Sequence, residues 1–307
     1  MQFPRTLLEF QAQFPDEASC WAYLRKARWP RGFLCPRCGS RGSHFIASRR
    51  LEQCRVCRYQ GSVTAGTVFH GTRVALQVWF LGIFFLARRK RGISALQFQK
   101  DTGLGSYQTA WSLLHKLRAA MAQEDPRQLL GRVEVDETYV GATRQRGIRG
   151  GREVGHKTIV AGAVEHLGRK AGALRLQVLG GISFQRDIGP FVHQTIDAQR
   201  SIVRTDGLAS YRSLPAAGFH HDPRVEGDRR RAKEILPLIH IIFTNLKAWI
   251  RGTFHGVSKK YMQRYLNEFV FRFDRRLDEF GLLQAVLNQT ARSEPCPYAQ
   301  LTAEAIG

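Results

Sequence analysis

Two cysteine pairs restrict what the first part of this 307-residue chain can fold into. Cys35 and Cys38 form one Cys-x2-Cys pair, and Cys54 and Cys57 form a second pair after fifteen intervening residues. Each pair suits a tight turn, and two such turns offer four thiolates in the tetrahedral arrangement that Zn²⁺ accepts. With all four positions filled by protein thiolates, none remains open for a substrate. The spacing therefore predicts a zinc ribbon whose Zn²⁺ is structural.

The surroundings of the cysteine pairs fit the same interpretation. Gly39 follows the first pair and Gly61 the second, and we expect both glycines to serve the turns. Residues 7–24 read as a short amphipathic helix that packs on the ribbon, so we place the N-terminal helix and the zinc ribbon together in residues 1–72. Cys20 and Cys296 lie outside the pattern and are expected to be unliganded.

The charge of the chain indicates a polyanionic partner. Lys and Arg together number 47 against 25 Asp and Glu, which gives a formal net charge of +22. Nucleic acid is the simplest partner for such an excess. The longest apolar stretch, residues 78–87, is shorter than the roughly 20 residues that span a bilayer. It also lies too far from the first residue to be a signal peptide. We therefore expect a cytoplasmic protein with no membrane partner, whose cysteines are reduced.

Residues 73–125 show helical spacing and are predicted to form a DNA-binding domain of the helix-turn-helix kind. Val74, Val78, Leu81 and Phe85 define one apolar stripe, and a second stripe runs from residue 113 to residue 121. Between the stripes, a short helix at 93–98, a glycine-containing turn at 102–105 and a longer helix opening at Ser106 are expected. A helical packing domain without DNA contacts would show the same spacing.

After residue 125 the pattern becomes mixed α/β. Strands are predicted at residues 132–140, 158–165, 174–179 and 201–205, and helices at 186–196, 208–214 and about 234–251. Three strands, a helix, a fourth strand and further helices is the order of a ribonuclease-H-like domain. We place this α/β domain in residues 126–285 and leave residues 286–307 as a C-terminal tail.

Two carboxylates at strand ends mark the candidate catalytic centre. Glu134 and Asp136 share one face of the first strand, and Glu137 points to the other face. Asp206 ends the fourth strand and would lie beside Asp136 if the two strands are neighbours. Two carboxylates so placed can hold paired divalent ions, Mg²⁺ or Mn²⁺, for an in-line displacement at a phosphodiester.

Several motifs together resemble one family. They are the four cysteines, the string from Val135 to Gly141, Thr205-Asp206-Gly207, Asn245-Leu246-Lys247, the string from Gly252 to Ser258 and the string from Tyr265 to Phe273. On these residues the chain resembles bacterial insertion-sequence transposases of the DDE type that carry an N-terminal zinc ribbon, a helix-turn-helix and a ribonuclease-H-like core. The resemblance extends to about Leu277, and it places the first two acidic ligands on Asp136 and Asp206.

The third catalytic position departs from the family pattern. The family carries a Glu about 34 residues after the second Asp, with a Lys seven residues later on the same helix face. Here His240 occupies that position and Lys247 follows it by seven, which leaves the two side chains about 20° apart around a helix. Asn245 is the alternative third residue. Imidazole is a poor Mg²⁺ ligand, so the site tolerates a weaker second metal such as Mn²⁺, uses His240 to orient water and phosphate, or is inactive.

The resemblance implies a DNA transposase that binds the ends of its element, cleaves them and joins the freed 3′-hydroxyl to target DNA. Asp136 and Asp206 then hold the catalytic metal, His240 completes the site and Lys247 contacts the terminal DNA backbone. Double-stranded DNA and further copies of the chain are the implied partners, and the protein would associate with the nucleoid. Two other hypotheses remain: a DNA-binding regulator with a degenerate core, and a metal-dependent nuclease that never joins ends.

Overall fold

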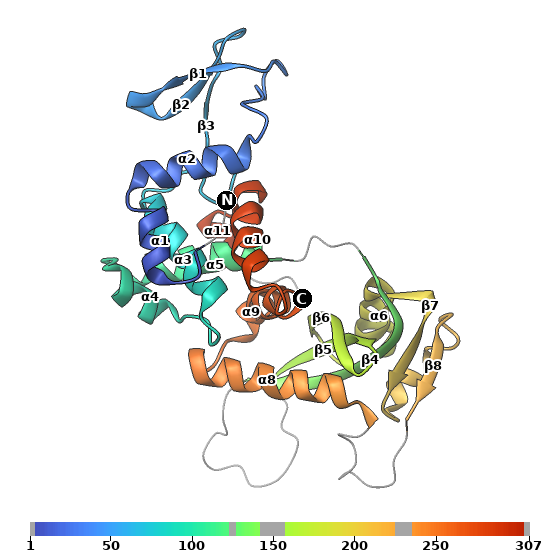
Figure 1. The fold of residues 1–307 in the computed structure, drawn as a ribbon. Helices are drawn as coiled ribbons and strands as arrows, with labels where there is room; N and C mark the ends of the chain where they lie inside the picture. The colour runs from blue at the N-terminus through green and yellow to red at the C-terminus, as the bar shows by residue number, and fades with distance from the viewer. Residues whose placement is uncertain (1–3, 123–126, 142–156, 225–234, 304–307) are drawn as a thin grey trace. The chain divides into compact units, whose positions relative to one another are not determined.

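The computed structural model of the chain describes residues 4–122, 127–141, 157–224 and 235–303 (Figure 1). These residues form two compact units. The first runs to Met121 and also includes Arg275–Ala303, and the second runs from Ala122 to Asp274. The domain boundary expected at residue 285 falls inside a helix, Glu279–Arg292, that packs within the first unit. The boundary expected at residues 125 and 126 lies outside the described residues.

The zinc-ribbon part of the first unit is a small antiparallel sheet of three strands in the order β1-β2-β3. A 3₁₀ turn, η1 (Ala47–Arg49), joins β1 to β2. Leu34 and Arg41 form an isolated bridge, so the first cysteine pair also sits at the end of a hairpin. The strands are β1 (Ser43–Ile46), β2 (Leu51–Cys54) and β3 (Gln60–Ser62).

Two helices precede the ribbon, where the sequence predicted one. Helix α1 (Leu7–Gln13) ends before Pro15, and α2 (Glu17–Arg28) starts anew because the Asp16 side chain accepts a hydrogen bond from the Ser19 N–H at 2.8 Å. Helix α2 touches the ribbon as expected. Its Arg28 donates to the carbonyl oxygens of Ser62 and Val63 at 3.0 and 2.6 Å.

The remaining helices of the first unit pack around a core rich in aromatic rings. Helix α3 is buried on most sides, and of the stripe expected on it only Phe85 is buried, since Val74, Val78 and Leu81 are partly exposed. The stripe from Leu113 to Met121 is buried as predicted. The helices are α3 (Leu76–Arg88), α4 (Ala95–Thr102), α5 (Tyr107–Ala120), α10 (Glu279–Arg292) and α11 (Tyr298–Thr302).

Helices α4 and α5 have the predicted helix, glycine turn and helix arrangement. The Ser94 hydroxyl caps α4 through the Gln97 N–H, and Gly103 ends it with φ +68°, a value that side chains rarely adopt. Ser106 lies at the N-cap position of α5 with extended backbone, but its side chain makes no capping hydrogen bond.

The second unit is built on a five-stranded mixed sheet with strand order β6-β5-β4-β7-β8. β4, β5 and β6 pair antiparallel, whereas β7 lies parallel to β4 and β8 parallel to β7. The α/β class is confirmed, and the arrangement is consistent with the expected ribonuclease-H-like core. The strands are β4 (Leu129–Val140), β5 (Thr158–Leu167), β6 (Lys170–Leu179), β7 (Ile196–Thr205) and β8 (His220–Pro223).

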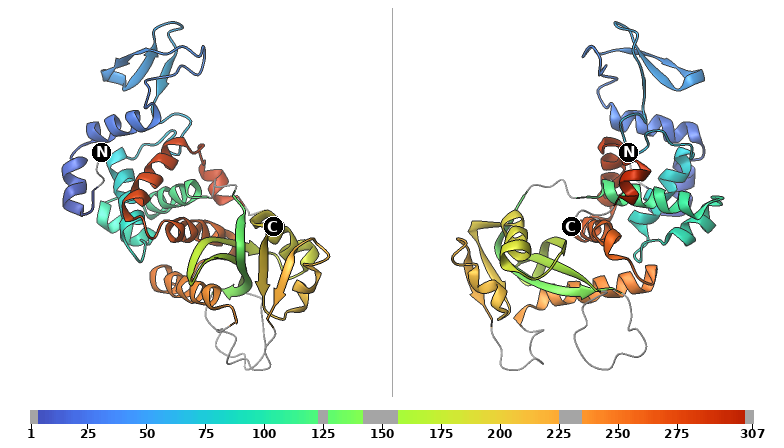
Figure 2. Two further views of the ribbon diagram at one scale, coloured as in Figure 1. Left: turned by 45° about the vertical axis from the view of Figure 1, so that its right-hand side comes forward. Right: turned by 180° about the vertical axis from the view of Figure 1, so that it is seen from behind.

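Helices cover both faces of this sheet (Figure 2). On one face α8 (Pro237–Phe254) and α9 (Lys259–Asp274) bury a core that includes Val164, Leu176 and Phe243. On the other face α6 (Gly189–Thr195) packs over Val133, Val135 and Val203. β4 therefore turns its two faces toward different helices. The face that carries Glu134 and Asp136 lies toward α8, and the other face lies toward α6.

Some connecting elements differ from expectation. Residues 184–195 form a π-helical turn, η2 (Phe184–Ile188), that leads into α6, and residues 208–214 contain a 3₁₀ turn, η3 (Ala209–Ser213), in place of a helix. Strand β8 was not predicted. The helix start expected near residue 234 lies outside the described residues, and α8 begins at Pro237. None of the helices in the described ranges is long and apolar enough to cross a membrane.

Candidate active site and metal centre

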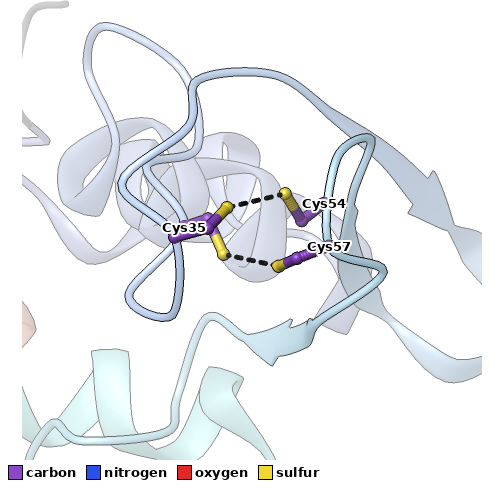
Figure 3. A group of neighbouring side chains, drawn as sticks. Cys35, Cys54 and Cys57 are labelled. Atoms are coloured by element: carbon purple, nitrogen blue, oxygen red, sulfur yellow. Dashed lines mark hydrogen bonds between the residues drawn. The ribbon is translucent and has the colours of Figure 1, made fainter.

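The four cysteines of the ribbon converge on one point. All four Sγ atoms lie within 4.8 Å of one another, with 3.5 Å between Cys35 and Cys57 and 3.7 Å between Cys38 and Cys54. Figure 3 labels three of them, Cys35, Cys54 and Cys57, and shows the sulfurs of the two turns facing each other. A tetrahedral Zn²⁺ with Zn–S bonds of about 2.3 Å needs sulfur separations of about 3.8 Å. The sulfurs thus fit Zn²⁺, and the four-cysteine cluster is confirmed.

The two cysteine turns have the same backbone geometry. The Gly39 N–H donates to the Cys35 carbonyl at 2.9 Å, and the Arg58 N–H donates to the Cys54 carbonyl at 3.2 Å. Both donors have positive φ, +69° at Gly39 and +60° at Arg58. The left-handed residue of the second turn is therefore Arg58, and the expectation that Gly61 would serve this turn was wrong. Gly61 lies in β3, where a side chain would meet the Phe33 ring at 3.1 Å.

Asp136 and Asp206 lie next to the point where the pairing between β4 and β7 stops. Parallel pairing of β4 and β7 sets Glu134 opposite Arg204, and each Asp follows two residues later on its own chain segment. The expected adjacency of the two strands is confirmed. The Asp206 carboxylate accepts a hydrogen bond from the Leu208 N–H at 3.0 Å. Partial burial, aided by the Asp136 carboxylate, raises the pKa of Asp206 above its ordinary value.

His240 on α8 faces the same carboxylates. Its Nε2 lies 3.3 Å from Asp136 Oδ2, with side chains that are 29% and 13% exposed. The hydrogen bond with Asp136 raises the pKa of His240. In the described residues, the four cysteines are the only group of three or more metal-ligating side chains that lies within 4.8 Å. Asp136, Asp206 and His240 form a looser set.

Lys247 and Asn245 are both exposed on α8. Lys247 lies two turns after His240 on nearly the same helix face, whereas Asn245 is about 140° away from His240 around the helix. Loss of water around the Lys247 ammonium group lowers the pKa of Lys247 although the residue is exposed as a whole, and the negative charge of Asp136 acts in the opposite direction. Lys247 is therefore within electrostatic reach of Asp136.

A buried carboxylate fixes the start of α8 beside the site. Glu134 is fully buried and accepts two hydrogen bonds. The Ile239 N–H donates to one carboxylate oxygen at 2.8 Å, and His166 Nε2 lies 2.7 Å from the other. Helix α8 has Leu236 at its N-cap and no side-chain cap of its own. A carboxylate on β4 thus satisfies an amide of the first turn of α8, next to His240. Sequence analysis assigned Glu134 to the correct face but missed this role.

Replacing Glu134 by alanine should destabilise the second unit. The change removes the acceptor of the Ile239 N–H and of His166 in a buried place, so we expect a loss of about 3 kcal/mol in the free energy of unfolding. Urea unfolding of the full chain, followed through the transition of the second unit, measures it. Glu134→Gln retains a carbonyl oxygen and should lose less. Equal stability of Glu134→Ala and the unchanged chain would contradict the capping role.

Glu137 lies on the opposite face of β4, as expected. The Tyr211 hydroxyl donates to its Oε2 at 2.6 Å, and Tyr211 is 1% exposed. Burial raises the pKa of Glu137 to about 7, and the negative charges of Asp136 and Asp206 contribute to the same shift. This buried pair ties β4 to η3, the segment that follows Asp206.

Two family models match this chain. The model described as an ISXO2-like transposase domain matches residues 128–274, and the model described as a transposase zinc-ribbon domain matches residues 15–60. The first match contains Asp136, Asp206 and α8, and the second contains all four cysteines of the cluster.

Individual relatives are more distant. An uncharacterized protein in the transposable element ISH50 of Halobacterium salinarum is 32% identical over 134 residues, which is 42% of this chain. The match spans 44% of that relative's length. A solved structure of the simian T-cell lymphotropic virus intasome with PP2A regulatory subunit B56 gamma is 8% identical, over 70% of this chain and 76% of that chain. The TM-score for this match is 0.26.

Proposed function

Since this chain matches insertion-sequence transposases of the DDE type with an N-terminal zinc ribbon, we propose that it cuts and joins DNA. The observation that carries the proposal is the placement of Asp136 and Asp206 two residues past the last pair of the parallel strands β4 and β7, with His240 against Asp136. The proposed substrate is double-stranded DNA: the ends of an element and a target. The chain would act as an oligomer on these ends.

Asp136 and Asp206 are the residues that would hold divalent metal ions. Their oxygen ligands suit Mg²⁺ or Mn²⁺, and the negative charge of Asp136, which contributes to the raised pKa of Asp206, would also favour a cation bound between them. When bound, such ions neutralise charge on the phosphodiester and activate the attacking hydroxyl. Two side chains of the chain itself position the substrate. His240 contacts water or phosphate next to Asp136, and Lys247 pairs with the DNA backbone.

Recognition of the element's ends is proposed to reside in the first unit. The first residues of α5, Ser106, Tyr107 and Gln108, are exposed where a second helix of this arrangement enters a major groove. The ribbon would hold its structural Zn²⁺ and present Arg side chains to phosphates.

A strand-transfer assay tests the proposal and separates it from its rivals. The full chain is incubated with a duplex from its own genomic flanks, a supercoiled plasmid target, and Mg²⁺ or Mn²⁺. A transposase yields joined products. Cleavage without joining would instead identify a nuclease, and binding without cleavage would identify a DNA-binding regulator. Zinc-replete protein with neither metal is the blank.

The third catalytic position gives a prediction of its own. If His240 is a weak substitute for a carboxylate, His240→Glu should keep or raise strand transfer with Mg²⁺, because carboxylate is the better ligand for this ion. His240→Ala should lower it. Asn245→Ala is the matched control on the same helix and should have a mild effect. A dead Asn245→Ala protein beside a fully active His240→Ala protein would assign the third position to Asn245.

A further inference from the structure

A second concave surface lies on the sheet face that carries Asp136 and Asp206. It is a hollow of about 510 Å³, which we name the Arg132 hollow. Three of its residues form one row across three strands, because Arg132 on β4 pairs with Ile202 on β7, and Ile202 pairs with His220 on β8. Paired residues share a face of a sheet, and Asp136 lies on that same face of β4, four residues after Arg132.

The hollow is open because α8 does not cover this part of the sheet. Helix α8 packs on β4 and β5, and β7 and β8 lie beyond its N-terminal end (Figure 1). Arg132, Ile202 and His220 are all exposed. Four residues of a strand span about 13 Å, so the hollow lies about that far from Asp136. A DNA strand engaged at Asp136 and Asp206 would pass the hollow within a few nucleotides.

The charges of the hollow suit a phosphate group. Its lining includes Arg132, Arg200, His166 and His220 and, among the described residues, no carboxylate. Arg132 makes no ion pair within the described part of the chain. Guanidinium groups bind phosphate oxygens in two-pronged fashion, which makes an unpaired Arg an effective phosphate contact.

The acidic groups near the hollow are already engaged. Asp197 pairs with Arg200 at 2.7 Å. On the next row Asp222 pairs with both Arg204 at 2.8 Å and Arg224 at 3.0 Å. Glu134 lies behind His166, is fully buried and bonds to its ring. Repulsion of an incoming phosphate is therefore weak, and the Arg132 guanidinium remains available.

We propose that the Arg132 hollow binds a backbone phosphate of the DNA strand that is cut at Asp136 and Asp206. The inference rests on the proposed function, because it takes DNA as the substrate of the second unit. Arg132 provides the principal contact and His220 a second donor. The hollow thus fixes the strand on the part of this sheet face that α8 does not cover.

Neutral backbone substitutions test this contact in a binding assay without catalytic metal. Duplexes from the chain's genomic flanks carry one methylphosphonate each, in turn at every position, and bind the full chain. At the position that meets Arg132, the unchanged chain should lose affinity by up to about fivefold. Arg132→Gln should lose no further affinity there, and its salt slope should be smaller by about 1. Arg132→Lys should recover part of the loss.

Arg186→Gln is the matched control, since it removes the same charge from an exposed residue of η2, which packs with the helices of the opposite face. Arg186→Gln should keep the same loss of affinity at each methylphosphonate position as the unchanged chain. The proposal is overturned if Arg132→Gln keeps the full salt slope and every methylphosphonate effect. Release of DNA by inorganic phosphate at constant ionic strength, seen with the unchanged chain and absent from Arg132→Gln, would support the contact, because free phosphate would then compete with the DNA for the same site.

This test does not depend on catalysis. If the chain joins no DNA but Arg132 is coupled to one phosphate, the proposal for the Arg132 hollow stands and the transposase proposal fails. If the chain joins DNA without that coupling, the transposase proposal stands and the proposal for the Arg132 hollow fails.

Discussion

Asp136→Ala and Asp206→Ala should each lower DNA cleavage and joining by several orders of magnitude. Each change deletes a charged oxygen ligand two residues past the last pair between β4 and β7, and the remaining carboxylate cannot hold two metal ions alone. Both activities should fall together, because one centre carries out both. Cleavage and strand transfer are measured separately, on an intact duplex and on one that already ends in a free 3′-hydroxyl.

The variants must keep their fold and their DNA binding for this result to count. Affinity for the duplex in the absence of divalent metal should be unchanged, because DNA binding depends on Arg and Lys contacts to phosphates. Asp197→Ala is the matched control: it removes a carboxylate from the other end of β7, where Asp197 pairs with Arg200. If Asp206→Ala joined DNA at the unchanged rate, Asp206 would not be a ligand of the catalytic metal.

The second large effect concerns zinc. Cys54→Ser should reduce the bound metal from about one Zn²⁺ per chain to a small fraction and unfold the ribbon, because structural zinc supplies on the order of 10 kcal/mol of folding free energy in such small domains. Cys54 is fully buried, and the N–H groups of Cys57 and Val56 lower its pKa to about 6, which favours the thiolate. Selective binding to the element's ends should be lost with the ribbon.

Metal analysis by mass spectrometry and a binding assay with competitor DNA measure the two consequences. Cys296→Ser is the control, since Cys296 lies outside the cluster of four. It should keep one zinc and full end selectivity. A Cys54→Ser protein with its zinc intact and normal selectivity would disprove a structural four-thiolate site.

Features set by local spacing could be predicted from the sequence. The cysteine pairs, the helix and turn around Gly103 and the alternation of β4 are properties of short segments, and each is present in the structure. Asp136 and Asp206 could be brought together because β4 and β7 are parallel neighbours, so that residues two positions past one pair lie near each other. His240 was reached through the family's spacing, about 34 residues after Asp206 and seven before Lys247, and it lies against Asp136 in the structure.

Features set by distant contacts could not be predicted. Neither α3 nor α8 has a side-chain cap at its own start. Glu17 on α2 accepts hydrogen bonds from Leu76 and Gln77 at the start of α3, and Glu134 does so for α8. The only hint in the sequence is that neither helix start has a Ser, Thr, Asp or Asn at its N-cap, which suggests that a distant side chain accepts from the first amides. β8 was missed because four residues with two histidines and a proline carry little strand signal.

The remote cap of α8 has a consequence for the nascent protein. Glu134 and Ile239 are separated by 105 positions, so the first turn of α8 gains its acceptor only after the ribosome has released the whole sheet and the helix itself. At typical synthesis rates of about 5–20 residues per second, several seconds pass between the two. Once β7 has been synthesised and has paired with β4, Asp136 and Asp206 lie near each other, but His240 has no fixed place until α8 forms. A chain whose synthesis has not yet reached α8 therefore lacks a complete catalytic centre, because His240 and Lys247 both lie on that helix.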